Sequence, residues 1–223
     1  MLGIFIMDVT HSTSYHNTDE ISDFLIKLEK NITEWTAILP RSYVNFRMGD
    51  ELFFVSDSPS STLVLAYYIK LLWPFNNQPI KFGIAIGDAV MPDNQFEHWN
   101  DPLIKRARVA LDDIKTHDQV DFKLVAPDDS SLYNHILFYY LTDIMQMQTD
   151  IQRQVYLHSL TTSTQKELAR LCSKSVSTIS THLKKGRSRQ LMLIQQSLKD
   201  YDETFEPRME QLIHHYIKQE ASL

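Results

Sequence analysis

Two acidic positions have the residue types and spacing of a metal site: Asp8, which ends an apolar run, and the adjacent pair Asp50 and Glu51. The run Met1–Met7 predicts a buried strand, and the pair lies in a turn between two further strand-like runs. If the third strand runs antiparallel beside the first, these carboxylates meet at one sheet edge. They repel one another there unless a cation or a proton intervenes, and hard oxygen ligands favour Mg²⁺. The alternative is a set of solvated acids at a strand end.

A second region with chemical potential is the basic segment between Thr161 and Gln190. Seven bases and one acid give this segment a net charge of +6, whereas the whole chain has −6, so the remaining residues carry −12. A basic segment in an otherwise acidic chain is typical of a region that contacts a polyanion.

The same segment has the spacing of a helix-turn-helix. Residues 164–171 predict a short helix, Cys172–Lys174 a tight turn in which Ser173 stands where glycine is common, and Ser175–Lys185 a second helix ended by Gly186. Because Ser and Thr are poor helix formers, five of them in one helix indicate contacts to base edges, with Lys and Arg facing phosphates. The residues predicted to bind DNA are Gln165, Lys174, Ser175, Ser177, Thr178, Ser180, Thr181, His182, Lys184, Lys185, Arg187 and Arg189. The alternative is a helical hairpin with a solvated basic face.

Hydrophobic periodicity predicts the elements that position these residues. Their order is β-α-β-β-α-β and then α-β, with the last strand at Phe122–Val125. Gly49-Asp50 predicts a hairpin turn, because glycine tolerates positive φ. The first six elements match a ferredoxin-like antiparallel sheet with helices, so we expect the α+β class.

After Pro127 the pattern is helical, which predicts two domains. Residues 1–127 form the α+β domain, and residues 128–223 form an all-α helix-turn-helix domain with C-terminal helices. The tail contains two amphipathic stretches, one at Leu191–Tyr201 and one after Pro207. Helix-turn-helix proteins usually bind DNA as dimers, so these stretches are natural homodimer surfaces. Packing on their own domain is an equal alternative.

Composition excludes several classes of protein. Hydrophobic residues make up 43% of the chain and charged residues 22%, as is ordinary for a globular protein. No apolar run approaches the roughly 18–20 residues of a membrane helix, and no basic region precedes the first apolar run. We therefore expect no membrane contact, no secretory signal and a cytoplasmic location. The single cysteine, Cys172, excludes an internal disulfide and a Cys-based zinc cluster.

Several motifs resemble class III nucleotide cyclase domains. Ile4–Thr13 resembles their opening strand, where an Asp at the strand end holds a metal and a Ser/Thr pair follows. Phe46–Leu52 is similar to their Gly-Asp hairpin, and Ile80–Gly87 to a later strand. With the Arg-Ala-Arg-Val-Ala-Leu stretch at 106–111, the pattern resembles the bacterial SatD family more closely; many of its members carry a C-terminal helix-turn-helix.

The resemblance implies a cyclase-like N-terminal domain with Mg²⁺ held by Asp8, Asp50 and Glu51. It also implies a nucleotide site that includes Ser12, Thr13, Arg106 and Arg108. The two arginines are two residues apart and do not share a helix face, so only one is expected to reach the sheet edge. Glu51 stands where the cyclase hairpin often has glycine, and no base-selecting residues are evident. The resemblance thus favours a sensory or vestigial site over a working cyclase.

Together, these features predict a DNA-binding transcription regulator. Its partners would be double-stranded DNA, a nucleotide ligand and a second copy of the chain. The alternative is a Mg²⁺-dependent nucleotidyl cyclase-type enzyme whose basic tail localises it. A third reading is a protein-interaction module with a vestigial site.

Overall fold

The structure is a computed structural model that describes residues 1–12, 17–47 and 49–220. It has an α+β fold built on a five-stranded mixed sheet with the strand order β2-β3-β1-β4-β5. The pairs β1–β3, β1–β4 and β2–β3 are antiparallel, and β4–β5 is parallel. The strands are β1 (Leu2–Val9), β2 (Ser42–Arg47), β3 (Glu51–Ser56), β4 (Ile80–Gly87) and β5 (Phe122–Val125).

The helices of the N-terminal half occur in the predicted order among the strands. They are α1 (Thr18–Thr36), α2 (Pro59–Leu72) and α3 (Pro102–Ile114), with a short 3₁₀ helix at Phe96–His98. Proline opens α2 and α3, where its missing N–H has no helical partner to lose. The Asp101 carboxylate caps α3 by accepting a hydrogen bond from the Leu103 N–H at 2.8 Å.

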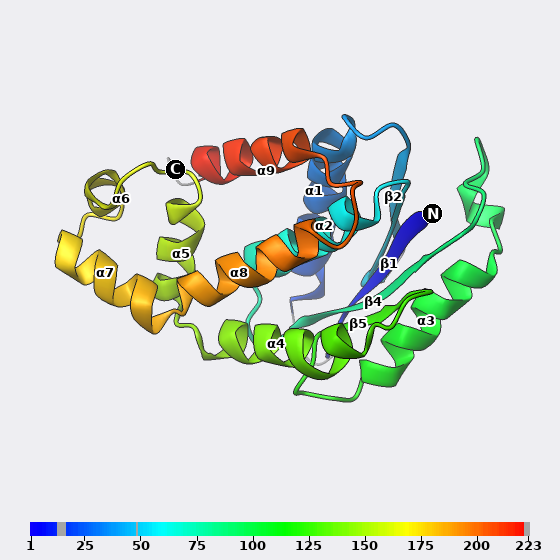
Figure 1. Cartoon of the computed structure of the whole chain (residues 1–223), viewed down its shortest axis with the longest axis horizontal. Helices are drawn as coiled ribbons and strands as arrows, with labels where there is room; N and C mark the ends of the chain where they lie inside the picture. Colours follow the sequence, from blue (N-terminus) through cyan, green and yellow to red (C-terminus); the bar gives the residue numbers. More distant parts are fainter. Residues whose placement is uncertain (13–16, 48, 221–223) are drawn as a thin grey trace.

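Helices lie on both sides of the sheet (Figure 1), and its central strands β1 and β4 are buried along their whole length. Alternate side chains of β1 point to opposite faces, so Phe5, Met7 and Val9 join the cluster under α1 and α2. Leu2, Ile4 and Ile6 join a second cluster, which α3 covers. The predicted hairpin between β2 and β3 is confirmed, and Gly49 has the positive φ of +118° that this turn requires.

The described chain after β5 is helical. A π-helical turn (Tyr133–Leu137) leads into six further helices: α4 (Phe138–Met147), α5 (Asp150–Ser159), α6 (Gln165–Leu171), α7 (Val176–Lys185), α8 (Ser188–Lys199) and α9 (Pro207–Glu220). Figure 1 shows α6 and α7 at one end of the molecule and α3 at the opposite end. None of the helices within the described ranges has the length and apolar character needed to cross a bilayer.

The two tail helices pack on the N-terminal half of the same chain. Helix α8 lies against α2, and α9 lies against α1, where the Trp35 and Tyr216 rings are 5.2 Å apart. The buried apolar residues Leu191, Ile213 and Ile217 belong to the same cluster as the sheet. Most of the apolar residues that suggested a dimer surface are therefore buried within the chain, but mainly against the N-terminal half, whereas the alternative reading expected them to pack on their own domain.

Buried hydrogen bonds also cross residue 127. The Tyr67 and Tyr156 hydroxyls are 2.7 Å apart, and the Tyr68 hydroxyl donates to Glu210 at 2.8 Å. All strands of the described chain therefore precede residue 127 and only helices follow it, but the packing is continuous across this position. A division into two domains at this point stays a prediction about the chain's organisation.

Candidate functional site

The two helices α6 and α7 of the basic segment form a compact unit with α5, which precedes it in the chain. Val155 of α5, Leu168 and Ala169 of α6, and Ile179 of α7 make a small buried cluster, distinct from the core under the sheet. Cys172 and Leu183 pack against it, so the lone cysteine has the role of a small half-buried hydrophobe. This cluster fixes the crossing of α6 and α7.

A tight turn joins these two helices. Ser173 has a φ of +52°, in the left-handed region that favours glycine. The Lys174 N–H reaches back to the Ala169 carbonyl at 2.9 Å, which closes the end of α6. Ser173 thus adopts the conformation that glycine commonly supplies at this position.

Local hydrogen bonds use some of the hydroxyl groups in α7. Ser175 is the N-cap, and its Oγ accepts from the Thr178 N–H at 3.1 Å. The Thr181 hydroxyl donates to the Ser177 carbonyl at 2.9 Å. The Ser175 side chain therefore stabilises the helix end, a role that its predicted contact with DNA did not include.

One face of α7 is exposed and polar. Ser177, Ser180, Thr181 and Lys184 recur at the three- and four-residue spacing that places side chains on one side of a helix, and all four are exposed. Gln165, Lys174, Ser175, Lys185 and Arg189 are also exposed, whereas Thr178 and His182 are half-buried. Most of the predicted DNA-binding residues are thus accessible.

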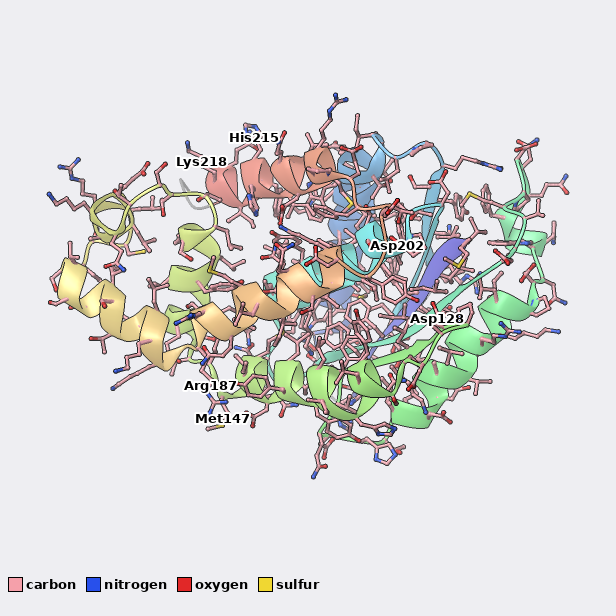
Figure 2. All side chains as sticks on the ribbon, in the orientation of Figure 1. Asp128, Met147, Arg187, Asp202, His215 and Lys218 are labelled. Atoms are coloured by element: carbon pink, nitrogen blue, oxygen red, sulfur yellow. The ribbon has the colours of Figure 1, made fainter. Side chains whose placement is uncertain are left out.

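Arg187 differs from the other predicted DNA-binding bases. It occupies the turn between α7 and α8 (Figure 2). Its Nη1 lies 3.1 Å from Asp143, and its guanidinium lies over the Tyr140 ring. Arg187 therefore contacts α4 of the same chain. Two bases outside the predicted set, Lys166 and Arg170, are exposed on α6 and line a shallow pocket of about 520 Å³ with Lys174. Their position on the first helix of the pair is the signal that could have identified them.

The predicted meeting of Asp8 with the Asp50-Glu51 turn is confirmed. Asp8 pairs with Glu51 in the β1–β3 register, and the Val9 N–H donates to the Asp50 carbonyl at 3.2 Å. The Ser12 hydroxyl donates to the Asp50 carboxylate. Asp8, Val9, Ser12 and Asp50 line a small pocket of about 260 Å³ with Lys115. Thr13, the other predicted hydroxyl ligand, lies outside the described residues.

Asp8 is the electrostatically unusual member of this carboxylate pocket. It is buried, its Oδ1 lies 3.1 Å from the Lys115 Nζ, and its Oδ2 is buried with no hydrogen-bond partner among the described residues. Burial raises the pKa of Asp8, and the charge on Asp50 adds to that rise, while Lys115 opposes it. The pocket thus contains an incompletely satisfied carboxylate.

Glu51 does not converge with the other two acids. Arg108 donates two hydrogen bonds to the Glu51 carboxylate, one of them from Nη2 to Oε1 at 2.6 Å. The Arg47 Nη1 lies 3.4 Å from the same Oε1. Arg106 is exposed on α3, so only one of the two arginines reaches the sheet edge, as expected. The protein therefore supplies its own arginines to Glu51, which leaves Asp8 and Asp50 as the carboxylates that line the pocket.

Asp8 and Asp50 fit the requirements of a Mg²⁺ site with two protein ligands. Mg²⁺ usually takes one or two carboxylates and completes its shell with phosphates and water, and the unpartnered Asp8 oxygen is a suitable donor. Across the described parts of the chain, no group of three or more His, Cys, Asp or Glu side chains is arranged to hold a metal. The fit is thus to a metal that arrives with phosphates.

No family model matches the chain, and no curated protein or solved structure matches it. The similarity to the SatD family and to cyclase domains therefore stays a prediction carried by the motifs themselves. The features that bear on function are the geometry of α6 and α7 and that of the carboxylate pocket.

Proposed function

We propose that the chain is a DNA-binding transcription regulator in which α6 and α7 form a helix-turn-helix. The observation that carries this proposal is the exposed hydroxyl and lysine face of α7, within a segment of net charge +6 on an otherwise acidic chain. In this arrangement α7 enters the major groove of double-stranded DNA. Hydroxyl groups of Ser177 and Ser180 contact base edges, while Lys184 and Lys185 contact phosphates.

The N-terminal half is proposed to be a cyclase-like sensory domain with a ferredoxin-like core. The order β2-β3-β1-β4 supports this reading, because it places the first and third strands side by side and antiparallel. Its carboxylate pocket would bind a nucleotide with Mg²⁺ through Asp8 and Asp50. A homodimer remains part of the proposal, but it requires a surface other than the buried faces of α8 and α9.

DNA binding is tested by fluorescence anisotropy with labelled duplexes over a range of salt concentrations. We expect the logarithm of affinity to fall linearly with that of salt, with a slope of about −0.9 for each phosphate neutralised. Replacing Lys184 and Lys185 with Ala should weaken binding to all sequences alike and reduce the slope by about 2. The matched control replaces Lys30 and Lys105, which are exposed on α1 and α3, with Ala. Salt-independent binding, or an equal loss in the control, would contradict the proposal.

A second candidate function is Mg²⁺-dependent nucleotidyl transfer. The observation that favours it is the unpartnered buried oxygen of Asp8 beside Asp50. The test is incubation with Mg²⁺ and ATP or GTP, with products read by chromatography. Turnover that Asp8→Asn and Asp50→Asn each abolish would make the enzyme the better reading. Binding without turnover supports a sensor, and no binding supports a vestigial site.

A further inference from the structure

A cavity larger than the carboxylate pocket lies between the end of α2, the start of β4 and the start of α5. It has a volume of about 460 Å³ and is lined by Lys70, Lys81, Trp73, Phe75, Gln148 and Arg153, among others. Cavities of roughly 300–1,000 Å³ are typical of small-molecule sites, and such sites combine apolar walls with a few placed polar groups. The aromatic side chains and the three bases give this cavity both features.

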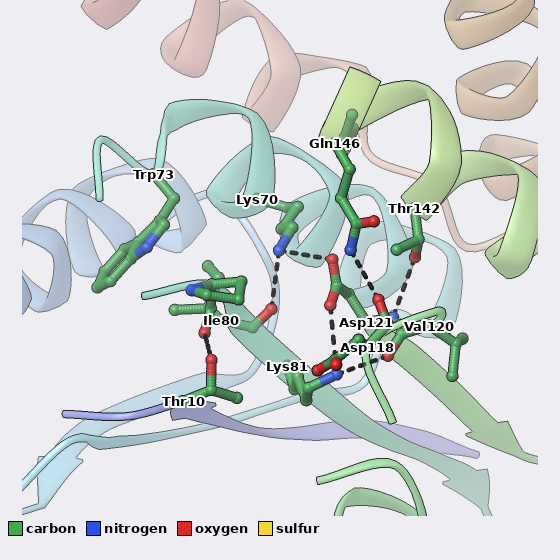
Figure 3. A network of polar contacts seen from close by, with 12 residues as sticks. Thr10, Lys70, Trp73, Ile80, Lys81, Asp118, Val120, Asp121, Thr142 and Gln146 are labelled. Carbon is green, nitrogen blue, oxygen red and sulfur yellow. Dashed lines mark hydrogen bonds and ion pairs between the residues drawn. The ribbon is translucent and has the colours of Figure 1, made fainter. Parts of the chain in front are cut away.

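The basic groups on the sheet side share one aspartate (Figure 3). Lys70 is buried on α2, with its Nζ 2.7 Å from Asp121 Oδ2 and donating to the Ile80 carbonyl at 3.0 Å. Lys81 donates to the Val120 carbonyl at 2.9 Å and lies 3.5 Å from Asp121 Oδ1. Asp121 and Asp118 are the acids in the lining, against three bases, so the cavity has a net positive charge.

Arg153 supplies donors from the α5 side. Its Nη1 donates to the Trp73 carbonyl at 3.2 Å and to Asn76 Oδ1 at 2.7 Å, and its Nη2 donates to the Met145 carbonyl at 3.2 Å. These bonds hold the loop after α2 against α5. They leave the Nε hydrogen and one Nη2 hydrogen of Arg153 without an acceptor among the described residues.

Gln148 provides the independent sign that a ligand belongs here. Only 8% of this residue is exposed, and its Nε2 donates to the Gly186 carbonyl at 2.6 Å. Its Oε1 is buried and has no hydrogen-bond partner in the part of the chain that the structure describes. An unpaired buried oxygen is unfavourable, and Gln148 is one of the residues that line the cavity. A donor group that reaches this oxygen from the cavity would supply the partner that the described residues do not.

We propose that this cavity binds a small organic anion that also carries a hydrogen-bond donor. A carboxylate or phosphate group would accept from Arg153 and Lys70, a hydroxyl or amine would donate to Gln148 Oε1, and Trp73 would cover the carbon skeleton. The anionic class follows from the net charge of the lining and the unused Arg153 donors. The donor follows from the unpaired Gln148 oxygen.

The cavity is also joined to the end of α7. The carbonyl that Gln148 bonds belongs to Gly186, the C-cap of α7, whose own N–H donates to the His182 carbonyl at 2.8 Å. Arg153 and Gln148 flank the start of α5, which packs on α7. Gln148 therefore links the cavity to the C-terminal end of α7, and we expect occupancy of the cavity to change the affinity for DNA. This coupling rests on the proposed function, whereas binding to the cavity does not.

Binding is tested by calorimetry and thermal shift on the full chain with malate, glycerol 3-phosphate and inorganic phosphate. We expect one of the two organic anions to bind more tightly than inorganic phosphate, and the comparison between them separates a carboxylate from a phosphate ligand. Arg153→Gln and Gln148→Met should each weaken that binding about tenfold, while Arg208→Gln, at an exposed position on α9, should leave it unchanged. If Arg153→Gln does not fold, Gln148→Met decides, because it keeps the length of the side chain. Absence of binding by all three probes, or equal binding in the variants, overturns the proposal.

The coupling is tested separately by measuring DNA affinity with and without the anion that binds. A change in affinity that Gln148→Met removes supports the connection through Gly186. Anion binding with unchanged DNA affinity overturns the coupling but not the cavity site. Anion binding by a chain that binds no DNA at all overturns the proposed function and leaves the cavity site intact.

Discussion

The fold disfavours the charged form of the Asp8 carboxylate. The end of β1 removes it from water, and Lys115 satisfies only one of its two oxygens. Lys115 is itself half exposed, so water weakens its attraction for the carboxylate. The result is a raised pKa, caused first by burial and then increased by the neighbouring Asp50 charge. A buried carboxylate with one unpaired oxygen does not stabilise the fold, so its presence is better explained by binding of a ligand.

Replacing Asp8 with Asn is therefore expected to stabilise the ligand-free protein at neutral pH. Below the ordinary pKa of 3.8 the carboxyl is protonated in both states and carries no penalty. The penalty grows as pH rises through the interval up to the raised folded pKa, because only the unfolded state ionises freely there. The melting temperature of Asp8→Asn should exceed that of the unmodified protein at neutral pH by about 2–4 °C for each kcal/mol relieved.

Thermal melts from acid to neutral pH check this, with Asp23→Asn, at an exposed position on α1, as the control. The advantage of Asp8→Asn should shrink on acidification, whereas the control should show no such trend. A variant that melts below the unmodified protein at neutral pH would show that the Lys115 contact outweighs the burial of Asp8.

At the scale of elements, α3 and β4 depend on a close backbone approach at Gly83. A Cβ at this position would lie 2.2 Å from the Ala107 carbonyl oxygen and 2.4 Å from the Leu111 nitrogen. Neither backbone atom can move without shifting α3. Gly83→Ala should therefore destabilise the fold by about 1–3 kcal/mol or more, as overpacking of a core does.

The matched control is Gly87→Ala, on the same strand. There the nearest atom to a new Cβ is the flexible end of the Leu103 side chain, at 3.0 Å. Urea unfolding of the two variants should show a large loss for Gly83→Ala and a small one for Gly87→Ala. Equal losses would mean that α3 adjusts its packing on β4 freely.

Within α7, neighbouring serines are expected to have different roles. Ser175 caps the helix, so Ser175→Ala should lower stability by about 1 kcal/mol through the lost cap. The exposed Ser177 hydroxyl caps no backbone group and lies 2.9 Å from the Ser175 hydroxyl. Ser177→Ala should therefore cost less stability than Ser175→Ala, and it should change sequence preference by about 1–3 kcal/mol for the base that it contacts. Urea unfolding and binding to duplexes with single-base changes measure the two effects. Altered preference in Ser175→Ala alone would reverse the assignment.

The elements of the N-terminal half could be predicted because their signals are local. Strand periodicity, Pro59 and Pro102 at helix starts, and Gly49 in a hairpin each depend on a few neighbouring residues. The meeting of Asp8 with the hairpin followed from one assumption about strand pairing, which the register confirms. The partner of Glu51 could not be predicted, because Arg108 reaches it from an element 57 residues later in the chain.

At the scale of the whole molecule, sequence patterns predict an apolar helix face but not what covers it. Helices α8 and α9 have the amphipathic pattern of a dimer surface, yet α1 and α2 cover them. The cavity beside Lys70 was missed for a similar reason, since its walls come from α2, β4 and the start of α5. The available signal was a lysine within the apolar run Leu63–Trp73, because a charge in a buried helix needs a partner.

The continuous core predicts that the chain unfolds as one cooperative unit. Residues of β1 and α2 belong to the same buried cluster as Met209 and Ile213 of α9, and the Tyr67–Tyr156 hydroxyl pair adds a buried polar link. Ile213→Ala removes a fully buried side chain and should destabilise the chain by about 2–5 kcal/mol. Because the cluster is shared, strand and helix signals should shift together in urea.

Far-ultraviolet circular dichroism and tryptophan fluorescence provide the two probes. Trp35, Trp73 and Trp99 all lie in the N-terminal half, while the helices after β5 contribute strongly to the dichroism. Coincident transitions in the unmodified protein and in Ile213→Ala are expected, as two-state unfolding requires. The control is Leu212→Ala on the same helix, where the side chain is 41% exposed and the loss should be small. The contrary result is two separated transitions, with Ile213→Ala shifting only the one that reports the helices after residue 127. It would show that these helices fold independently of the sheet.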